Sequence, residues 1–240
     1  MDLFSYLASG IGVYVGLVVF TLGMGWRVWQ WMRTPRSPVR LALYPKPQTS
    51  LGRLGKLLKD TLIAPQSWET AGTLMAFAMA FHLAALAAFV GHLRLVHEFT
   101  PLVALLGVEG MNQFAGLSGG AAGIIMLVVV LYWIARRTYG AYRKLSTPED
   151  YLLLALLLGI VVMGDHLRFV GHLHASTYQV WFASLMAFKP AFPPELADSA
   201  TRLALNWHML FVDAFLIYFP FSKMTHAIGA FATNLVRSGE

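Results

Sequence analysis

The sequence predicts an all-α membrane protein, built as a bundle of five transmembrane helices. Of its 240 residues, 57% are apolar and 12% are charged, whereas soluble domains carry about 25% charged residues. The mean hydropathy is +0.59. The apolar runs approach or exceed the roughly 20 residues that a helix needs to cross a bilayer. They are too long for the short alternating strands of a membrane β-barrel.

The apolar runs divide the chain into five expected spans, which we interpret as one membrane domain over residues 1–240. The spans are expected at residues 6–32, 70–93, 112–134, 151–172 and 202–228. The first ends in a belt of tryptophan and arginine, which is typical of a membrane–water interface. Because each span crosses the membrane, the connections between consecutive spans lie alternately on its two sides.

The basic residues of these loops indicate the orientation. The connection of residues 33–68 holds seven Lys or Arg residues against a single acid, Asp60. The third connection holds four more, whereas the second and fourth hold one each, Arg94 and Lys189. Because basic loops stay on the cytoplasmic side, we expect the N-terminus outside and the C-terminus in the cytoplasm. The predicted location is the cytoplasmic (inner) membrane of a prokaryote, crossed several times.

The loop of residues 33–68 contains a second pattern. Leucines recur at helical spacing and basic residues lie between them: Leu51, Leu54, Leu57, Leu58 and Leu62, with Arg53, Lys56 and Lys59. This pattern predicts an amphipathic helix. Two interpretations stay open: the helix lies on the membrane surface, or it docks a soluble subunit.

Four histidines lie inside the apolar spans, His82 and His92 in the second and His208 and His226 in the fifth. A histidine in hydrocarbon is costly, so such residues are functional candidates. The chain has no cysteine, which excludes thiolate-bound iron–sulfur clusters, disulfides and covalently attached c-type haem. Two helices with two imidazoles each can ligate two haem irons axially, one near each face of the membrane.

The spacing of the histidines predicts how they pair. His82 and His92 are ten residues apart, about 15 Å along a helix and about 80° around it. His208 and His226 are eighteen apart, five whole turns, so both should project from one helix face. Because the two spans run in opposite directions, His92 meets His208 at the outer level and His82 meets His226 at the inner level.

These residues and their flanks resemble the gamma subunit of respiratory nitrate reductases. The similar segments are Phe81-His82, Phe89-Val90-Gly91-His92, His208, Phe219-Pro220-Phe221-Ser222-Lys223, His226, Gly119-Gly120 and Gly23-x-x-Trp26-Arg27. The resemblance implies a five-helix cytochrome with two haem b groups. It further implies that the protein oxidises a quinol, such as menaquinol, near the outer haem and passes electrons to a cytoplasmic iron–sulfur subunit.

The sequence departs from that family in two places. Met111-Asn112-Gln113 occupies the region where the family places a basic residue near the quinol, and the first cytoplasmic loop is longer. Both features are more similar to the membrane cytochromes of sulfite-reduction-associated (Dsr-type) complexes. The expected partner is therefore a heterodisulfide-reductase-like or nitrate-reductase-beta-like iron–sulfur protein, with further membrane or periplasmic subunits. Nucleic acid is not an expected partner.

The outer end of the fourth span, residues 164–174, is polar and would face a quinol beside the outer haem. Quinol oxidation needs a proton acceptor and a hydrogen-bond donor. The candidates are Asp165, His166, Arg168, His172 and, more weakly, His97. The alternative is an interfacial segment whose polar groups meet water. Asp213 also lies within hydrocarbon, so it must be protonated or paired, and Arg168 is a candidate partner.

Other functions stay open at this stage. One alternative is electron flow in the reverse direction, from a cytoplasmic donor to the quinone, since the same parts serve both directions. A histidine-lined transporter and a passive anchor without haem are the remaining alternatives. No residue is assigned as certainly catalytic, because the chain is expected to be an electron-transfer subunit and not a complete enzyme.

Overall fold

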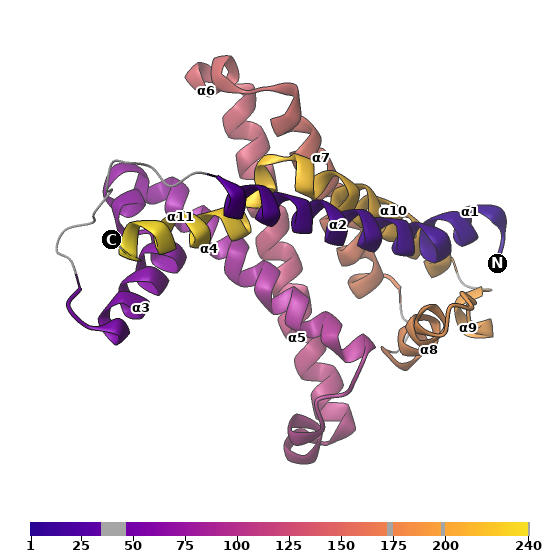
Figure 1. The fold of residues 1–240 in the computed structure, drawn as a ribbon. Coiled ribbons are helices and arrows are strands. Elements are labelled where there is room, and N and C mark those ends of the chain that lie inside the picture. The colour runs from indigo at the N-terminus through magenta and orange to yellow at the C-terminus, as the bar shows by residue number, and fades with distance from the viewer. Residues whose placement is uncertain (35–46, 172–174, 198–199, 240) are drawn as a thin grey trace. The chain divides into compact units, whose positions relative to one another are not determined.

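The computed structural model of the chain describes residues 1–34, 47–171, 175–197 and 200–239, and every regular element in them is helical (Figure 1). The α-helices are α1 (Leu3–Tyr6), α2 (Gly12–Arg33), α3 (Ser50–Leu58), α4 (Pro65–His92), α5 (Thr100–Thr138), α6 (Gly140–Leu145), α7 (Pro148–Phe169), α8 (Ala175–Met186), α9 (Pro194–Ala197), α10 (Thr201–Tyr218) and α11 (His226–Gly239). Short π-helical turns, η1 (Leu7–Ile11) and η2 (Lys59–Ile63), and 3₁₀ turns, η3 (Leu93–Leu95), η4 (Phe219–Phe221) and η5 (Lys223–Thr225), join them.

Five helical stretches of the described chain are long and apolar enough to cross a membrane. They are Leu3–Arg33, Ser50–Leu95, Thr100–Thr138, Pro148–Phe169 and Thr201–Phe221. The all-α class and the five spans predicted from the sequence are confirmed. The fourth span ends at Phe169, three residues earlier than predicted, and Val170 is its C-cap.

Local chemistry sets where the spans begin and bend. Thr147 and Asp150 form a capping box at the start of α7, with Pro148 in the first turn, so the exposed N–H groups of that helix end are satisfied. α4 leaves helical geometry at Ala71. α5 does so at Gly107, whose φ of +72° is a conformation that favours glycine. In each helix the longer apolar part follows the irregular residue.

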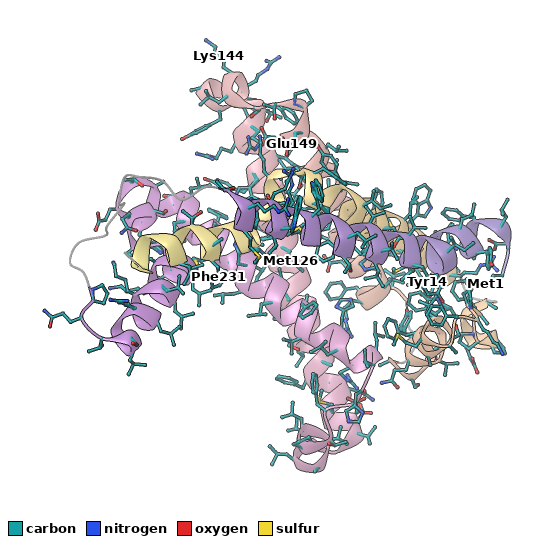
Figure 2. All side chains as sticks on the ribbon, in the orientation of Figure 1. Met1, Tyr14, Met126, Lys144, Glu149 and Phe231 are labelled. Atoms are coloured by element: carbon teal, nitrogen blue, oxygen red, sulfur yellow. The ribbon has the colours of Figure 1, made fainter. Side chains whose placement is uncertain are left out.

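The contacts divide the chain into two compact units, which we describe separately. The first unit comprises Met1–Val18 and Ala78–Ile217. Its core is formed by buried residues of α2, α8, α9 and α10: Val13, Trp181, Leu185, Leu196 and Leu205. The Tyr14 hydroxyl donates to Leu185 O at 2.7 Å (Figure 2), and Trp181 Nε1 donates to Ser9 O at 3.0 Å. These bonds tie α8 to the first span.

Glycines let neighbouring helices of this unit approach closely. A Cβ at Gly159 of α7 would lie 2.6 Å from Cγ of Phe211 on α10, directly against the ring. A Cβ at Gly120 of α5 would lie 3.0 Å from Cζ of Phe169 on α7. Both contacts are tighter than a side chain allows without movement of the neighbour, so the absence of a Cβ sets the helix separation.

The second unit comprises Val19–Phe77 and Tyr218–Glu240. Here Gly23 of α2 lies against the ring of Pro220, whose carbonyl accepts a hydrogen bond from Arg27 Nε at 2.8 Å. α11 packs beside α3 (Figure 1), and Asn234 Nδ2 donates to Thr61 Oγ1 at 3.1 Å. The basic loop segment that contains α3 thus packs against the C-terminal helix α11.

The last span differs from the prediction of one helix over residues 202–228. The α-helix ends at Tyr218, and Ser222 adopts an extended conformation, with φ −109° and ψ 175°, before α11 begins at His226. Pro220 cannot donate a backbone hydrogen bond, which favours such a break. The expectation that His208 and His226 share one helix face is therefore wrong, because no continuous helix connects them.

We predict that Gly159→Ala destabilises the protein by about 1–3 kcal/mol, the usual cost of overpacking a tight contact. The added methyl group would force the Phe211 ring away from α7. Denaturant-induced unfolding in detergent measures the effect. Gly116→Ala on α5 is the matched control, since nothing lies within 4 Å of a Cβ there, and its effect should stay within about 0.5 kcal/mol. Equal effects of the two substitutions would contradict this packing.

Candidate functional site

His82 and His92 project from α4 and are both exposed in the chain alone. Each ring Nδ1 lies 2.7 Å from the backbone carbonyl four residues earlier, Ala78 O and Ala88 O respectively. A carbonyl can accept but not donate, so in the neutral ring the proton is on Nδ1 and the lone pair is on Nε2. Metal-bound histidines usually have this arrangement.

The surface of α4 around these rings is apolar and bare. Leu83, Leu86 and Phe89 are each 58–65% exposed, and a Cβ at Gly91 would meet nothing within 4 Å. Exposed imidazoles beside exposed large apolar side chains suit a flat, mostly hydrophobic group that needs axial nitrogen ligands. Porphyrin has these properties, so the residues present fit a haem.

His208 is held by α7. Its Nδ1 donates to Ile160 O at 3.0 Å, so its lone pair is again on Nε2. One turn further along α7, a Cβ at Gly164 would lie 3.3 Å from Cε1 of the same ring. The α7 backbone therefore supplies a hydrogen-bond acceptor at one residue and space for the imidazole at the next turn.

His226 begins α11, and its Nδ1 lies 3.0 Å from Lys223 O. All four predicted haem ligands thus have the same tautomer-fixing contact. An electrostatic interaction connects His92 with His208, the residues of the predicted outer pair, and both belong to the first unit. His82 and His226 belong to different units, so their pairing stays a prediction.

A different kind of metal site finds less support. Among the described residues, no three His, Cys, Asp or Glu side chains come together in a way that suits a metal ion. Non-haem sites usually draw on three or four such ligands. Pairs of histidines are what axial haem ligation needs.

The predicted quinol candidates lie at several places, and most of them are toward the C-terminal end of α7. Asp165 packs against Gly123 of α5, and the Arg168 guanidinium lies over Gly119, 3.1 Å from the position of a Cβ. His166 is exposed on the same helix, and His97 is exposed after η3. His172 lies outside the described residues. Asp165 and Arg168 are thus brought to neighbouring turns of one helix, α5.

A polar network that the sequence did not predict surrounds Arg94. This buried guanidinium donates to both carboxylate oxygens of Glu98, at 2.7 and 3.0 Å, and to Asn112 Oδ1 at 3.0 Å. Gln179 Nε2 of α8 donates to Arg94 O at 2.7 Å. The hydrogen bond from Arg94 holds the pKa of Glu98 below its ordinary value of 4.5. A basic group therefore does reach the Met111-Asn112-Gln113 region, but from the end of the second span.

Tyr178 of α8 is a second residue that sequence reasoning missed. Its hydroxyl is buried and has no hydrogen-bond partner among the described residues. Burial raises the pKa of this phenol, and the charge of Arg168 acts in the opposite direction. A buried hydroxyl beside a guanidinium is a candidate hydrogen-bond donor for a quinone oxygen. Nothing in the sequence near Tyr178 marks it, because the proximity arises from packing.

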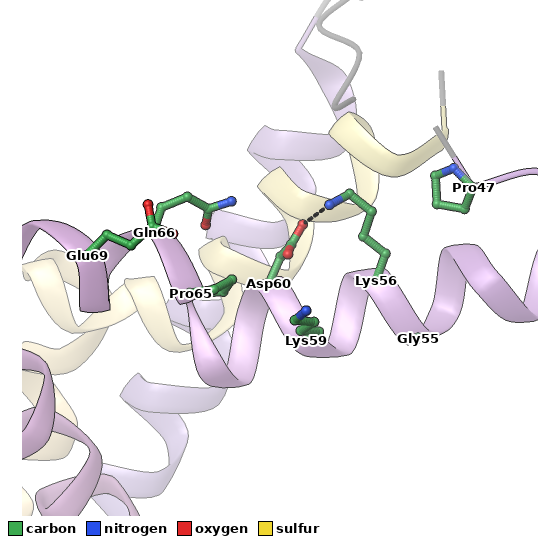
Figure 3. Close-up of a pocket in the computed structure, with 8 residues that line it drawn as sticks. All are labelled: Pro47, Gly55, Lys56, Lys59, Asp60, Pro65, Gln66 and Glu69. Atoms are coloured by element: carbon green, nitrogen blue, oxygen red, sulfur yellow. Dashed lines mark ion pairs between the residues drawn. The ribbon is translucent and has the colours of Figure 1, made fainter. Parts of the chain in front are cut away.

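The predicted amphipathic helix exists as α3, in the second unit. Arg53 and Lys59 are exposed, whereas Lys56 pairs with Asp60 at 3.0 Å. Leu51 is 79% exposed. A hollow of 580 Å³ lies beside the helix (Figure 3), and its lining is polar and proline-rich: Pro47, Gly55, Lys56, Lys59, Asp60, Pro65, Gln66 and Glu69. α3 thus presents both basic and apolar groups outward.

Comparison with known proteins identifies the family. Residues 66–238, which include all four histidines, match the family described as "Nitrate reductase gamma subunit". The chain belongs to this family. The resemblance inferred from the histidine flanks is confirmed.

The similar proteins have two kinds of name, menaquinol oxidoreductase cytochrome b-like subunit and nitrate reductase gamma chain. The chain is 24% identical to the Hdr-like menaquinol oxidoreductase cytochrome b-like subunit of Archaeoglobus fulgidus, over 91% of this chain and 75% of that protein. It is 28% identical to the nitrate reductase gamma chain of Bacillus subtilis, over 66% of this chain and 73% of that one. The respiratory nitrate reductase 1 gamma chain of Escherichia coli is 26% identical, over 61% and 67% respectively.

We predict that Glu98→Gln lowers stability at pH 7 and that its difference from the parent protein disappears in acid. The folded state lowers the pKa of Glu98, so its stabilising contribution is complete above about pH 4.5 and is lost as pH falls through the lowered value. Thermal unfolding in detergent between pH 3 and pH 7 measures this. Glu109→Gln, on an exposed acid of α5, is the control and should show no such trend. A pH-independent effect of Glu98→Gln would contradict the Arg94–Glu98 contribution.

Proposed function

We propose that this protein is the di-haem b-type membrane subunit of a respiratory complex, which carries electrons between the quinone pool and a cytoplasmic iron–sulfur partner. The observation that carries the proposal is the common geometry of the four histidines. Each Nδ1 contacts a backbone carbonyl, which directs Nε2 toward a metal. Membership of the gamma subunit family and the cytochrome b-like relatives support the same conclusion.

In this proposal, His92 and His208 hold the outer haem and His82 and His226 hold the inner one. The haems, when bound, accept and pass on single electrons across the bilayer. The chain contributes the axial nitrogens, the tautomer of each ring and the apolar surface around α4. Ile160 O and Gly164 orient the ring of His208.

We place quinol oxidation at the outer end of α7, where the candidate residues concentrate. Asp165 is the candidate proton acceptor, and Arg168 and Tyr178 are candidate hydrogen-bond donors to the quinol oxygens. His166, His172 and His97 are further candidates. The menaquinol named for the archaeal relatives is the proposed substrate. Protons would leave toward the outer face, while electrons move inward.

The membrane orientation and the partner complete the proposal. The basic loops predict an outside N-terminus and a cytoplasmic C-terminus in a prokaryotic cytoplasmic membrane. The archaeal relatives are named Hdr-like, which favours a heterodisulfide-reductase-like iron–sulfur partner over a nitrate-reductase-beta-like one. The surface formed by α3 and α11, within the second unit, is the proposed docking surface, because it offers exposed basic and apolar side chains together.

We predict that the purified protein contains two b-type haems and that the histidines control them in pairs. His92→Ala or His208→Ala should each remove one of the two haems, the same one, because each leaves that iron with one axial ligand. His82→Ala or His226→Ala should remove the other. Pyridine haemochrome content and redox-resolved absorption spectra measure this.

His166→Ala, which removes an imidazole outside the four, is the control and should leave both haems. Absence of haem from the parent protein would exclude the proposal. If His82→Ala and His208→Ala removed the same spectral component, the level-matched pairing would be wrong.

We predict that the charge reversals Arg53→Glu and Lys59→Glu, made together, weaken co-purification of the iron–sulfur partner by on the order of tenfold. Charged groups at an interface strongly affect association, and this double variant leaves the Lys56–Asp60 pair in place. Haem content should not change. The matched control reverses Arg143 and Lys144 of α6, in the other basic loop. Unchanged assembly would assign α3 to the membrane surface.

A further inference from the structure

Asp213 of α10 is a buried acid with no ion pair among the described residues. The residue is 4% exposed, and neither carboxylate oxygen has a hydrogen-bond partner among the described residues. Arg168, the partner expected from the sequence, lies over Gly119 of α5 instead. A lone carboxylate in hydrocarbon is costly, so the isolated chain favours the neutral acid.

The first span is shaped around this carboxyl. A Cβ at Gly12 would collide with Oδ2 of Asp213, and a Cβ at Gly16 would lie 3.4 Å from Oδ1. Gly12 directly follows the π-helical turn η1, and such turns are frequent at functional sites. The acid is therefore accommodated by two glycines that leave room for it but offer it no bond.

A line of buried polar side chains leads from Asp213 toward the N-terminal end of the first span. Asn206 lies two turns before Asp213 on the same face of α10 and is 1% exposed. Asn206 Nδ2 donates to Ser5 Oγ at 2.8 Å, and its Oδ1 accepts from Ser9 Oγ at 2.7 Å. Both serines are 0% exposed. Ser5, Ser9, Gly12 and Gly16 recur at spacings of four and three, so they share one helix face.

No ion pair or hydrogen bond joins Asp213 to the ionisable groups of three elements among the described residues. On the first eighteen residues, on α10 and on α7 they are Asp2, Tyr6, Tyr14, Glu149, Asp150, Tyr151, Asp165, His166, Arg168, Arg202, His208 and Tyr218. Tyr14 donates to Leu185 O, and Arg202 pairs with Asp2 at 3.5 Å. His208, five residues before Asp213 and about 7.5 Å along the helix axis, is the proposed ligand of the outer haem.

We propose that Asp213 is a proton-binding site whose occupancy follows the redox state of the outer haem. This inference rests on the proposed function. A ferric iron has one more positive charge than a ferrous iron, and screening is weak inside the membrane. Oxidation of that iron therefore favours the carboxylate. Gain of one electron by that haem would be matched by the binding of one proton from the medium to the Asp213 carboxylate, which gives the neutral acid.

The polar line gives this proton a direction. Asn206, Ser9 and Ser5 are bonded to one another and lie about two helical turns from Asp213, toward the end of the first span that begins at Asp2, which the proposed orientation places at the outer face. The proton would leave by the same line when the electron moves on toward the inner haem. Asp213 would thereby take up one proton from that side when the haem is reduced and return it when the haem is reoxidised, with no net transfer.

The test is redox titration of the outer haem in the purified complex between pH 5.5 and pH 8.5. In the parent protein the midpoint potential should fall as pH rises, by at most about 59 mV for each tenfold fall in proton concentration. Asp213→Asn keeps the shape of the side chain and should remove this dependence. Glu109→Gln, an equally conservative change of an exposed acid on α5, is the matched control and should keep it.

Two further measurements guard against a variant that fails to fold. Gly16→Ser adds a hydroxyl within reach of Asp213 Oδ1, which would stabilise the carboxylate and move the pH-dependent range to lower pH. Infrared difference spectra, reduced minus oxidised, should contain a carboxylic acid C=O band that Asp213→Asn lacks.

The proposal is overturned if Asp213→Asn keeps the parental pH dependence, or if Glu109→Gln removes it as well. It is also overturned if no carboxylic acid band responds to reduction. These outcomes differ from failure of the proposed function, which would appear first as an absence of haem absorption from the parent protein.

Discussion

The cost of placing polar groups in hydrocarbon governs this structure. An unbonded imidazole in the membrane is expensive, and each of the four candidate haem ligands has its Nδ1 against a backbone carbonyl. That contact satisfies one ring nitrogen and leaves the other to a metal. The same contact therefore serves both the stability of the ring in the membrane and the proposed function.

Glycines provide the second constraint, since they decide how closely the helices that hold these groups approach. Gly164 leaves space for the ring of His208, and Gly159 for that of Phe211. Gly12 does the same for the carboxyl of Asp213. In each case a polar or aromatic side chain of α10 fills the space beside a glycine of a neighbouring helix, where any other residue would have its Cβ. The glycines of α2 and α7, which have no Cβ, therefore position α10 as much as its apolar contacts do.

Much of the architecture follows from the sequence because hydropathy acts locally. Five apolar runs predict five spans, and the described chain has them. The flanks of His82 and His208 correctly identified the family. The prediction of a last span to residue 228 was wrong, because Pro220 and Ser222 break the helix inside an apolar run. Hydropathy averages over such a break, whereas backbone hydrogen bonding does not.

The sequence by itself therefore determined the all-α class, the number of helices able to cross a membrane and the family. Tertiary structure decided which polar groups meet. Arg94 reaches Asn112 across eighteen residues, and Arg168 acts on Tyr178 from a different helix. Asp213 has no bonding partner among the described residues, although Arg168 was an available candidate. Such encounters depend on helix separation and rotation, which are set by side-chain packing between segments distant in the chain, and no local pattern encodes them.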